Sequence, residues 1–155
     1  MITRGYQPED CSEIIQLFYD TVHTINLRDY SQEQIDVWAP TQIDHDRWNR
    51  TLQKNHTIIV EFNNTIVGFG DIDDTGYFDH LYVHKAYQGQ SVATRIANEI
   101  EQYAKSRGIK LISTHSSITA RPFFEQRGYQ VITHQSVKRG NQVLTNFIME
   151  KRLEE

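Results

Sequence analysis

The segment Gln88–Ala93, which reads Gln-Gly-Gln-Ser-Val-Ala, carries the clearest chemical signal in the sequence. An apolar segment with strand character, Tyr77–Val83, leads into it, and an amphipathic segment with helical spacing, Ala93–Arg107, leads out. A small-residue turn between a strand and a helix directs backbone N–H groups and the positive end of the helix dipole at one point, which suits an anion and above all a phosphate. The sequence therefore predicts that a phosphorylated cofactor is bound by Gln88, Gly89, Gln90, Ser91, Val92 and Ala93.

A plainer interpretation of this turn stays open. Serine is a good helix N-cap, so the segment is equally typical of an ordinary connection between a strand and a helix. A phosphate-binding turn tolerates Ser91 if its backbone stays right-handed, because a positive φ is costly for serine.

Hydrophobic spacing and turn residues place this turn in a series of strands and helices. The expected strands are 2–6, 56–62, 65–72, 77–83, 110–114, 129–136 and 143–150, and the expected helices are 8–24, 31–38, 91–107 and 119–127. The order β-α-α-β-β-β-α-β-α-β-β predicts an α/β protein, a mixed sheet covered by helices, in one domain over residues 1–155. Segment 44–53 is a further helical piece that this order does not count. Strands 77–83 and 110–114 are expected to be parallel, joined by a right-handed crossover.

Composition and charge exclude several classes of protein. Of 155 residues, 38% are hydrophobic and 23% are charged, as in a globular protein of one domain. The net charge of −4 and the dispersed basic residues argue against a nucleic-acid partner. We find no signal peptide and no run long enough to cross a membrane, and Cys11 alone cannot form an intrachain disulfide, so we expect a cytoplasmic protein without a membrane partner. The seven histidines lack the spacing of metal ligands, so no metal is expected.

With these elements in order, the chain resembles the GNAT superfamily, the GCN5-related N-acetyltransferases, and within it a small bacterial subgroup. The cofactor loop of that family reads Gln/Arg-x-x-Gly-x-Gly/Ala; segment 88–93 fits the first and last positions, with Ser91 in place of a glycine. The family's second motif, Asn-x-x-Ala-x-x-Phe-Tyr-x-x-x-Gly-Phe, is matched by segment 117–129, with Ser117 for asparagine and Phe124 for tyrosine. Two motifs at the right separation support the fold and the cofactor but name no acceptor.

The resemblance implies that acetyl-CoA is the co-substrate, with its pyrophosphate on the backbone amides of loop 88–93. It implies further that a bulge splays the preceding strand, so that backbone groups of Leu81, Tyr82 and Val83 reach the pantetheine arm and one N–H polarises the thioester carbonyl. Ser117 and Phe124, from the second motif, are expected beside the cofactor. The alternative is that the apolar side chains of the strand belong to the core alone.

Amine attack on a thioester calls for a base, because alkyl amines are protonated at neutral pH. Tyr77 stands where many relatives have the glutamate that acts as the base. Asp79 shares the face of Tyr77 by simple alternation and is the preferred base. A bulge would shift the alternation and present His80 instead. A surface carboxylate and an exposed strand histidine without a catalytic role are the alternatives.

Phe124 removes an acid from the expected site. A tyrosine there protonates the departing thiolate in many relatives, whereas phenylalanine has no proton to donate. A thiol with a reference pKa of about 8.5 is an acceptable leaving group, and water, Tyr129 or Ser117 is able to protonate it later. We therefore expect an N-acetyltransferase that moves the acetyl group directly to a primary amine in a ternary complex. The alternative is a sensor or regulatory module that binds acyl-CoA and has lost efficient chemistry.

The first helices and the last hairpin are expected to recognise the acceptor. The candidate binding residues come from an aromatic wall and from the last strand: His23, Tyr30, Trp38, Thr145 and Asn146. The alternatives are that the aromatic residues pack in the core and that Thr145 and Asn146 lie at a solvated edge of the sheet. The acceptor is expected to be a small-molecule amine or an amine of a peptide or protein. A homodimer is expected by analogy with similar folds.

Overall fold

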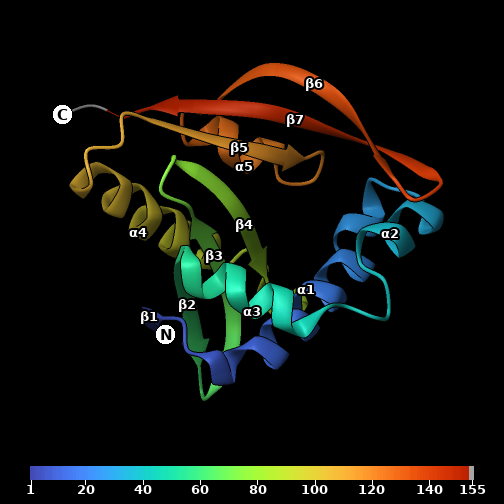
Figure 1. Cartoon of the computed structure of the whole chain (residues 1–155), viewed down its shortest axis with the longest axis horizontal. Coiled ribbons are helices and arrows are strands. Elements are labelled where there is room, and N and C mark those ends of the chain that lie inside the picture. Colours follow the sequence, from blue (N-terminus) through green and yellow to red (C-terminus); the bar gives the residue numbers. More distant parts are fainter. Residues whose placement is uncertain (154–155) are drawn as a thin grey trace.

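The structure, a computed structural model, describes residues 1–153 and contains one seven-stranded sheet in the order β1-β2-β3-β4-β5-β7-β6 (Figure 1). The strands are β1 (Ile2–Gly5), β2 (His56–Phe62), β3 (Thr65–Ile72), β4 (Tyr77–Val83), β5 (Leu111–Ser117), β6 (Gln130–Arg139) and β7 (Gln142–Arg152). Neighbouring strands are antiparallel except β4 and β5, which are parallel, with α4 (Val92–Ser106) in the crossover. The predicted α/β class with a mixed sheet is confirmed.

Helices connect the strands, and most begin where the sequence predicts. Besides α4, the described residues form α1 (Cys11–Thr24), α2 (Gln32–Trp38), α3 (His45–Lys54), α5 (Arg121–Gln126) and the short 3-10 helices η1 (Pro8–Asp10), η2 (Asn26–Arg28) and η3 (Lys85–Tyr87). The capping box of α2 is present: the Ser31 hydroxyl accepts from the Gln34 N–H, and the Gln34 side chain accepts from the Ser31 N–H.

One helix has to be added to the predicted order. Segment 44–53 becomes α3, a separate helix, because the Asp44 carboxylate accepts a hydrogen bond from the Arg47 N–H at 3.1 Å and so starts a new helix after α2 has ended. Strand β5 also runs past its predicted end to Ser117, since it keeps pairing with β7.

The helices bury two separate apolar cores, one on each face of the sheet. Helices α4 and α5 cover the face that carries Ile58, Phe78 and Ile112, while α1, α2 and α3 cover the face that carries Ile59 and Phe69. Alternate residues of one strand therefore serve different cores. No helix within residues 1–153 has the length and apolar character needed to span a bilayer.

Strands β4 and β5 separate soon after they meet. They pair only at Tyr77 with Ser113 and at Phe78 with Thr114, and Figure 1 shows β4 turning away from β5 beyond that point. The sheet is therefore split between its two central strands, and the split opens into a wedge.

A β-bulge lies at the start of this wedge. The pairing of β3 with β4 shifts register there: Ile72 faces Phe78 and Asp71 faces His80, so Asp79 is the extra residue. Phe78 consequently packs with α4, while His80, two positions on, lies on the face of α3. The simple alternation that favoured Asp79 over His80 is broken at this bulge.

Two glycines of β3 let α4 approach the sheet closely. A Cβ added at Gly70 would lie 2.6 Å from Ile96 Cγ2 and 2.9 Å from the His80 carbonyl oxygen, and one at Gly68 would lie 2.5 Å from Val92 Cγ1. Because backbone atoms are among these neighbours, the contact cannot be relieved by rotating a side chain.

We therefore expect Gly70→Ala to lower the free energy of unfolding by about 1–3 kcal/mol, as overpacking of a core does. Gly5→Ala in β1 is the matched control, because nothing lies within 4 Å of its added Cβ. Urea denaturation of both variants measures the difference. Equal unfolding midpoints for the two variants would show that α4 is free to move away from β3.

Candidate active site

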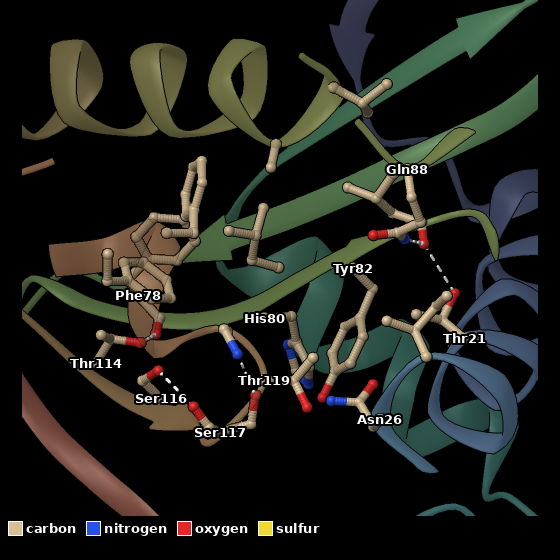
Figure 2. Close-up of a pocket in the computed structure, with 18 of the residues that line it drawn as sticks. Thr21, Asn26, Phe78, His80, Tyr82, Gln88, Thr114, Ser116, Ser117 and Thr119 are labelled. Carbon is tan, nitrogen blue, oxygen red and sulfur yellow. Dashed lines mark hydrogen bonds between the residues drawn. The ribbon is translucent and has the colours of Figure 1, made fainter. Parts of the chain in front are cut away.

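The wedge between β4 and β5 holds a cavity of about 430 Å³, which we call the wedge cavity. Figure 2 shows Thr114 and Ser117 of β5 on one side of it, Thr21 and Gln88 on the other, and His80 between them. Ten residues predicted to bind the cofactor line it: Leu81, Tyr82, Val83, Gln88, Gly89, Ser91, Val92, Ala93, Ser117 and Phe124. Gln90, also predicted, is exposed and lies outside the lining.

The start of α4 faces the wedge cavity with open amides. Ser91 is the N-cap residue, but its hydroxyl caps no N–H of the helix, so the N–H groups of the first turn, including those of Val92 and Ala93, keep their capacity to bind a ligand. Ser91 has φ 65°, so its backbone is left-handed, which is the conformation that is costly for serine. The turn bends sharply at both Gly89, with φ 73°, and Ser91, and this curvature aims the helix start at the cavity.

Side chains brace the loop from behind. The Gln88 amide donates to the carbonyl oxygens of Val83 at 2.7 Å and His84 at 3.5 Å, and the Thr21 hydroxyl donates to the same Val83 oxygen at 3.0 Å. His84 is tied down as well, since its Nδ1 accepts from the Ala86 N–H at 3.0 Å. The side chain of Gln88 therefore holds the loop in shape, and its contribution to a ligand is through the backbone.

A buried carboxylate holds His80. Asp71 is fully buried and accepts hydrogen bonds from the His80 backbone N–H at 2.8 Å, the His80 ring at Nδ1 at 2.9 Å and the Asn55 amide at 3.0 Å. Asp79 Oδ2 lies 3.7 Å from the same Nδ1. Because Nδ1 is occupied by Asp71, Nε2 is the ring nitrogen left to act in the cavity.

The surroundings of His80 favour its charged form. Burial by itself lowers the pKa of an imidazole, but the charge of Asp71, its hydrogen bond and the charge of Asp79 together outweigh burial and raise the pKa of His80 to about 9. Burial raises the pKa of the Asp79 carboxyl above its ordinary value; the charge of His80 opposes that rise and the charge of Asp71 supports it.

Asp71 was missed by the sequence reasoning, although a signal was present. It is the one charged residue of β3, a strand whose other residues are apolar, glycine or threonine. A charge in a strand buried on both faces needs a partner, and the bulge supplies His80. Within residues 1–153, the ligand atoms of Asp71, Asp79 and His80 lie within 4.8 Å of one another, as metal ligands do, but the hydrogen bonds of Asp71 account for this grouping without an ion.

A second cavity of about 720 Å³ lies between α3 and the β6–β7 hairpin; we call it the hairpin cavity. Of the residues predicted to bind the acceptor, Tyr30, Trp38, Thr145 and Asn146 line it. The two cavities share six lining residues: Trp38, Asp79, His80, Tyr82, His115 and Ser117. The proton-transfer candidates therefore lie where the cavities meet.

Two of the predicted acceptor residues serve the fold. His23 lies outside both linings, because its ring bonds the Ala39 carbonyl oxygen at 2.7 Å and stacks on Tyr19 at 4.0 Å. Tyr30 uses its hydroxyl to donate to the Thr145 carbonyl oxygen at 2.6 Å and to accept from the Ile118 N–H at 2.9 Å. His23 therefore lies outside the candidate site, whereas Tyr30 forms part of the wall of the hairpin cavity.

The second motif packs as an aromatic wall of the wedge cavity. Phe124 is 3% exposed and meets Phe78 edge-on at 5.5 Å. Tyr129 is buried outside both linings, with its hydroxyl donating to Glu101 at 3.0 Å, so it is not placed to protonate a ligand. The Ser117 hydroxyl accepts from the Ala120 N–H at 3.0 Å and keeps its own proton to donate.

Asp71→Asn is expected to lower the pKa of His80 from about 9 towards or below its ordinary 6.5, because burial would then act without the main compensating charge. NMR titration of the imidazole signals, assigned with His80→Gln, measures this. An unchanged pKa of His80 in the variant would show that Asp71 does not control its protonation.

The same change alters how stability depends on pH. In the wild type the folded-state pKa exceeds the unfolded one, so the stabilisation from His80 is complete below about pH 6.5 and is lost as the pH rises through about 9. The variant should lack this alkaline decline when urea unfolding is followed over that range.

Comparisons with known proteins agree with this geometry. A family model described as an acetyltransferase (GNAT) domain matches residues 26–153. The uncharacterized N-acetyltransferase YafP of Escherichia coli strain K12 is 34% identical over 146 residues, which cover 94% of this chain and 92% of that protein. A crystal structure from Rhodopseudomonas palustris, described as a GCN5-related N-acetyltransferase ("Aminotransferase, Class-II"), has a TM-score of 0.94 and 30% identity over 98% of this chain and 95% of that one. The PaiA N-acetyltransferase of Thermoplasma acidophilum, crystallised with coenzyme A, has a TM-score of 0.80 and 18% identity over 98% of each chain. The chain therefore belongs to the GNAT family of acetyltransferases.

Proposed function

We propose that this chain transfers the acetyl group of acetyl-CoA directly to a primary amine, with both substrates bound at once. The observation that carries this proposal is the meeting of two cavities at Asp79 and His80. A thioester arriving through the wedge cavity and an amine arriving through the hairpin cavity would meet beside groups able to move a proton.

The residues of the wedge cavity fit coenzyme A. The uncapped amides at the start of α4 suit its pyrophosphate. Strand β4 is no longer paired with β5 at Leu81, Tyr82 and Val83, so the edge of β4 that faces the wedge is open to the pantetheine arm. A neighbour of the same fold, from Thermoplasma acidophilum, was crystallised with coenzyme A, which supports coenzyme A as the carrier of the acetyl group.

Nε2 of His80 is the base in this proposal. Its pKa of about 9 lies near that of an alkyl ammonium, about 10, so the proton passes between groups of similar affinity. Asp79, beside it, attracts the ammonium and holds the amine at the junction of the cavities. The neutral imidazole is the active form, so the rate is expected to rise with pH.

The departing thiolate does not depend on position 124. Phe124 supplies an apolar wall and no proton. The thiol of the product has a reference pKa of about 8.5, so it leaves readily as the thiolate. Ser117 lines both cavities and its hydroxyl is free to donate a hydrogen bond to the thiolate, which makes it a substitute for the missing tyrosine until water supplies the proton.

Ala93→Glu is expected to abolish binding of coenzyme A, because it adds a negative charge and bulk where the pyrophosphate would lie. Gln102→Glu adds the same charge at an exposed position of the same helix outside the lining and should bind normally. Calorimetric titration with coenzyme A compares them. Equal affinity of the two variants for coenzyme A would contradict the proposal that the pyrophosphate binds at the start of α4.

His80→Gln is expected to lower kcat roughly a hundredfold, a common loss for a general base, while the affinity for coenzyme A stays unchanged.

Asp79→Asn is expected to raise KM for the amine more than it lowers kcat. In the wild type, kcat for a weakly basic acceptor such as a hydrazide should rise with an apparent pKa near 9. Thiol release from acetyl-CoA measures kcat, KM for the amine and their pH dependence, and calorimetric titration measures the affinity for coenzyme A.

A larger fall in kcat for Asp79→Asn than for His80→Gln would assign the base to Asp79. Binding of coenzyme A with no release of thiol from acetyl-CoA in the presence of any amine would instead favour the sensor function. The absence of an acidic side chain at Phe124 is compatible with that function.

A further inference from the structure

Two arginines line the hairpin cavity without an ionic partner. Arg47 comes from α3 and Arg139 is the last residue of β6, and both are exposed. Within the described part of the chain, 1–153, neither guanidinium takes part in an ion pair. Asp44 also lines the cavity, but its carboxylate caps α3 by accepting from the Arg47 backbone N–H. Both guanidinium groups are therefore available to an anion.

The inner end of the same cavity has the opposite character. Asp79 lies there, at the junction with the wedge cavity. The positive charge of His80, at the same junction, is balanced by Asp71. Asp79 is therefore the charged group that a ligand would meet at this end, and it attracts a cation.

Much of the remaining lining is aromatic. Trp38, Trp48 and Tyr77 contribute to it, and the rings of Trp48 and His80 lie 5.1 Å apart. The cavity volume, about 720 Å³, falls within the range of about 300–1,000 Å³ typical of sites for small molecules. A small ligand with an apolar middle part fits this lining.

We propose that the acceptor is a small amino carboxylate. Its amine lies at Asp79, its carboxylate binds Arg47 and Arg139, and an apolar chain joins the two groups. A polyamine fits poorly, because its second ammonium group would meet the two guanidinium groups. This inference rests on the proposed function, since it names the substrate class of the same site.

Three amines with the same number of carbon atoms test the proposal. They are ε-aminocaproate, hexylamine and hexamethylenediamine, which carry a carboxylate, a methyl group and a second amine at the far end. We expect kcat/KM to be highest for ε-aminocaproate and lowest for the diamine. Calorimetry on the protein loaded with coenzyme A measures binding of the same amines, and the same order of affinity is expected.

Two double variants distinguish a specific role of Arg47 and Arg139 from the general effect of removing positive charge. The double variant Arg47→Gln/Arg139→Gln is expected to lose roughly tenfold or more in kcat/KM and in affinity for ε-aminocaproate, as the loss of charge-assisted hydrogen bonds implies, with little change for hexylamine. Arg50→Gln/Lys138→Gln is the matched control, because it removes the same charge from exposed residues of α3 and β6 outside the lining.

Each outcome decides the matter. Preference for ε-aminocaproate that is lost in the double variant and kept in the control supports the proposal. Acetylation of hexylamine or of the diamine as fast as that of ε-aminocaproate overturns it while leaving the acetyltransferase function intact. Failure of ε-aminocaproate to bind the protein loaded with coenzyme A overturns it whether or not another amine is acetylated. Binding of ε-aminocaproate without acetyl transfer supports the ligand class and counts against the proposed function alone.

Discussion

The early separation of β4 from β5 is the constraint on which the rest of the structure depends. Backbone groups inside a sheet normally find partners in the neighbouring strand, and an unpaired group away from water is costly. Here two central strands pair at only two positions, so the following residues of β4 face a gap. The bulge at Asp79 adds the twist that starts this gap and at the same time turns His80 to the face of α3. One local irregularity thus lies both where the wedge cavity opens and where the proposed proton transfer takes place.

The electrostatics of the site follow from the same irregularity. Asp71 is a carboxylate with no exposed surface, and such a group persists only when its charge is answered by nearby donors. The bulge brings both the backbone N–H and the ring of His80 to it. While His80 is protonated, the pair is neutral overall, so the charge that an incoming ammonium would experience at the junction of the cavities is chiefly that of Asp79. In the proposed mechanism, attraction of the amine and transfer of its proton are thereby divided between Asp79 and His80.

Much of the fold could be predicted from the sequence because it depends on patterns of residues that are close together in the chain. The short apolar run of β2, the apolar stripe of α4 and the capping box at Ser31 depend on residues close together in the chain. The left-handed backbone of Ser91 could not be predicted in this way, since serine rarely adopts it and no local pattern in the sequence marks it. The bulge at Asp79 is a property of the pairing between two strands, so neither strand reveals it alone. His23 was misplaced for a similar reason: helical spacing gives a face, but the Ala39 carbonyl that holds the ring comes from another element.

Tyr30 links two parts of the molecule that a substrate would contact separately. Its hydroxyl joins the backbone of β7, which forms a wall of the hairpin cavity, to the backbone of the turn after β5, which closes the wedge cavity. A displacement of either wall therefore strains the other. Under the proposed function, accommodating a bulkier amine by shifting β7 would also disturb the binding of acetyl-CoA in the wedge cavity. Divergence of acceptor preference in proteins built this way is consequently expected to proceed by exchanging side chains on a fixed backbone rather than by moving the hairpin.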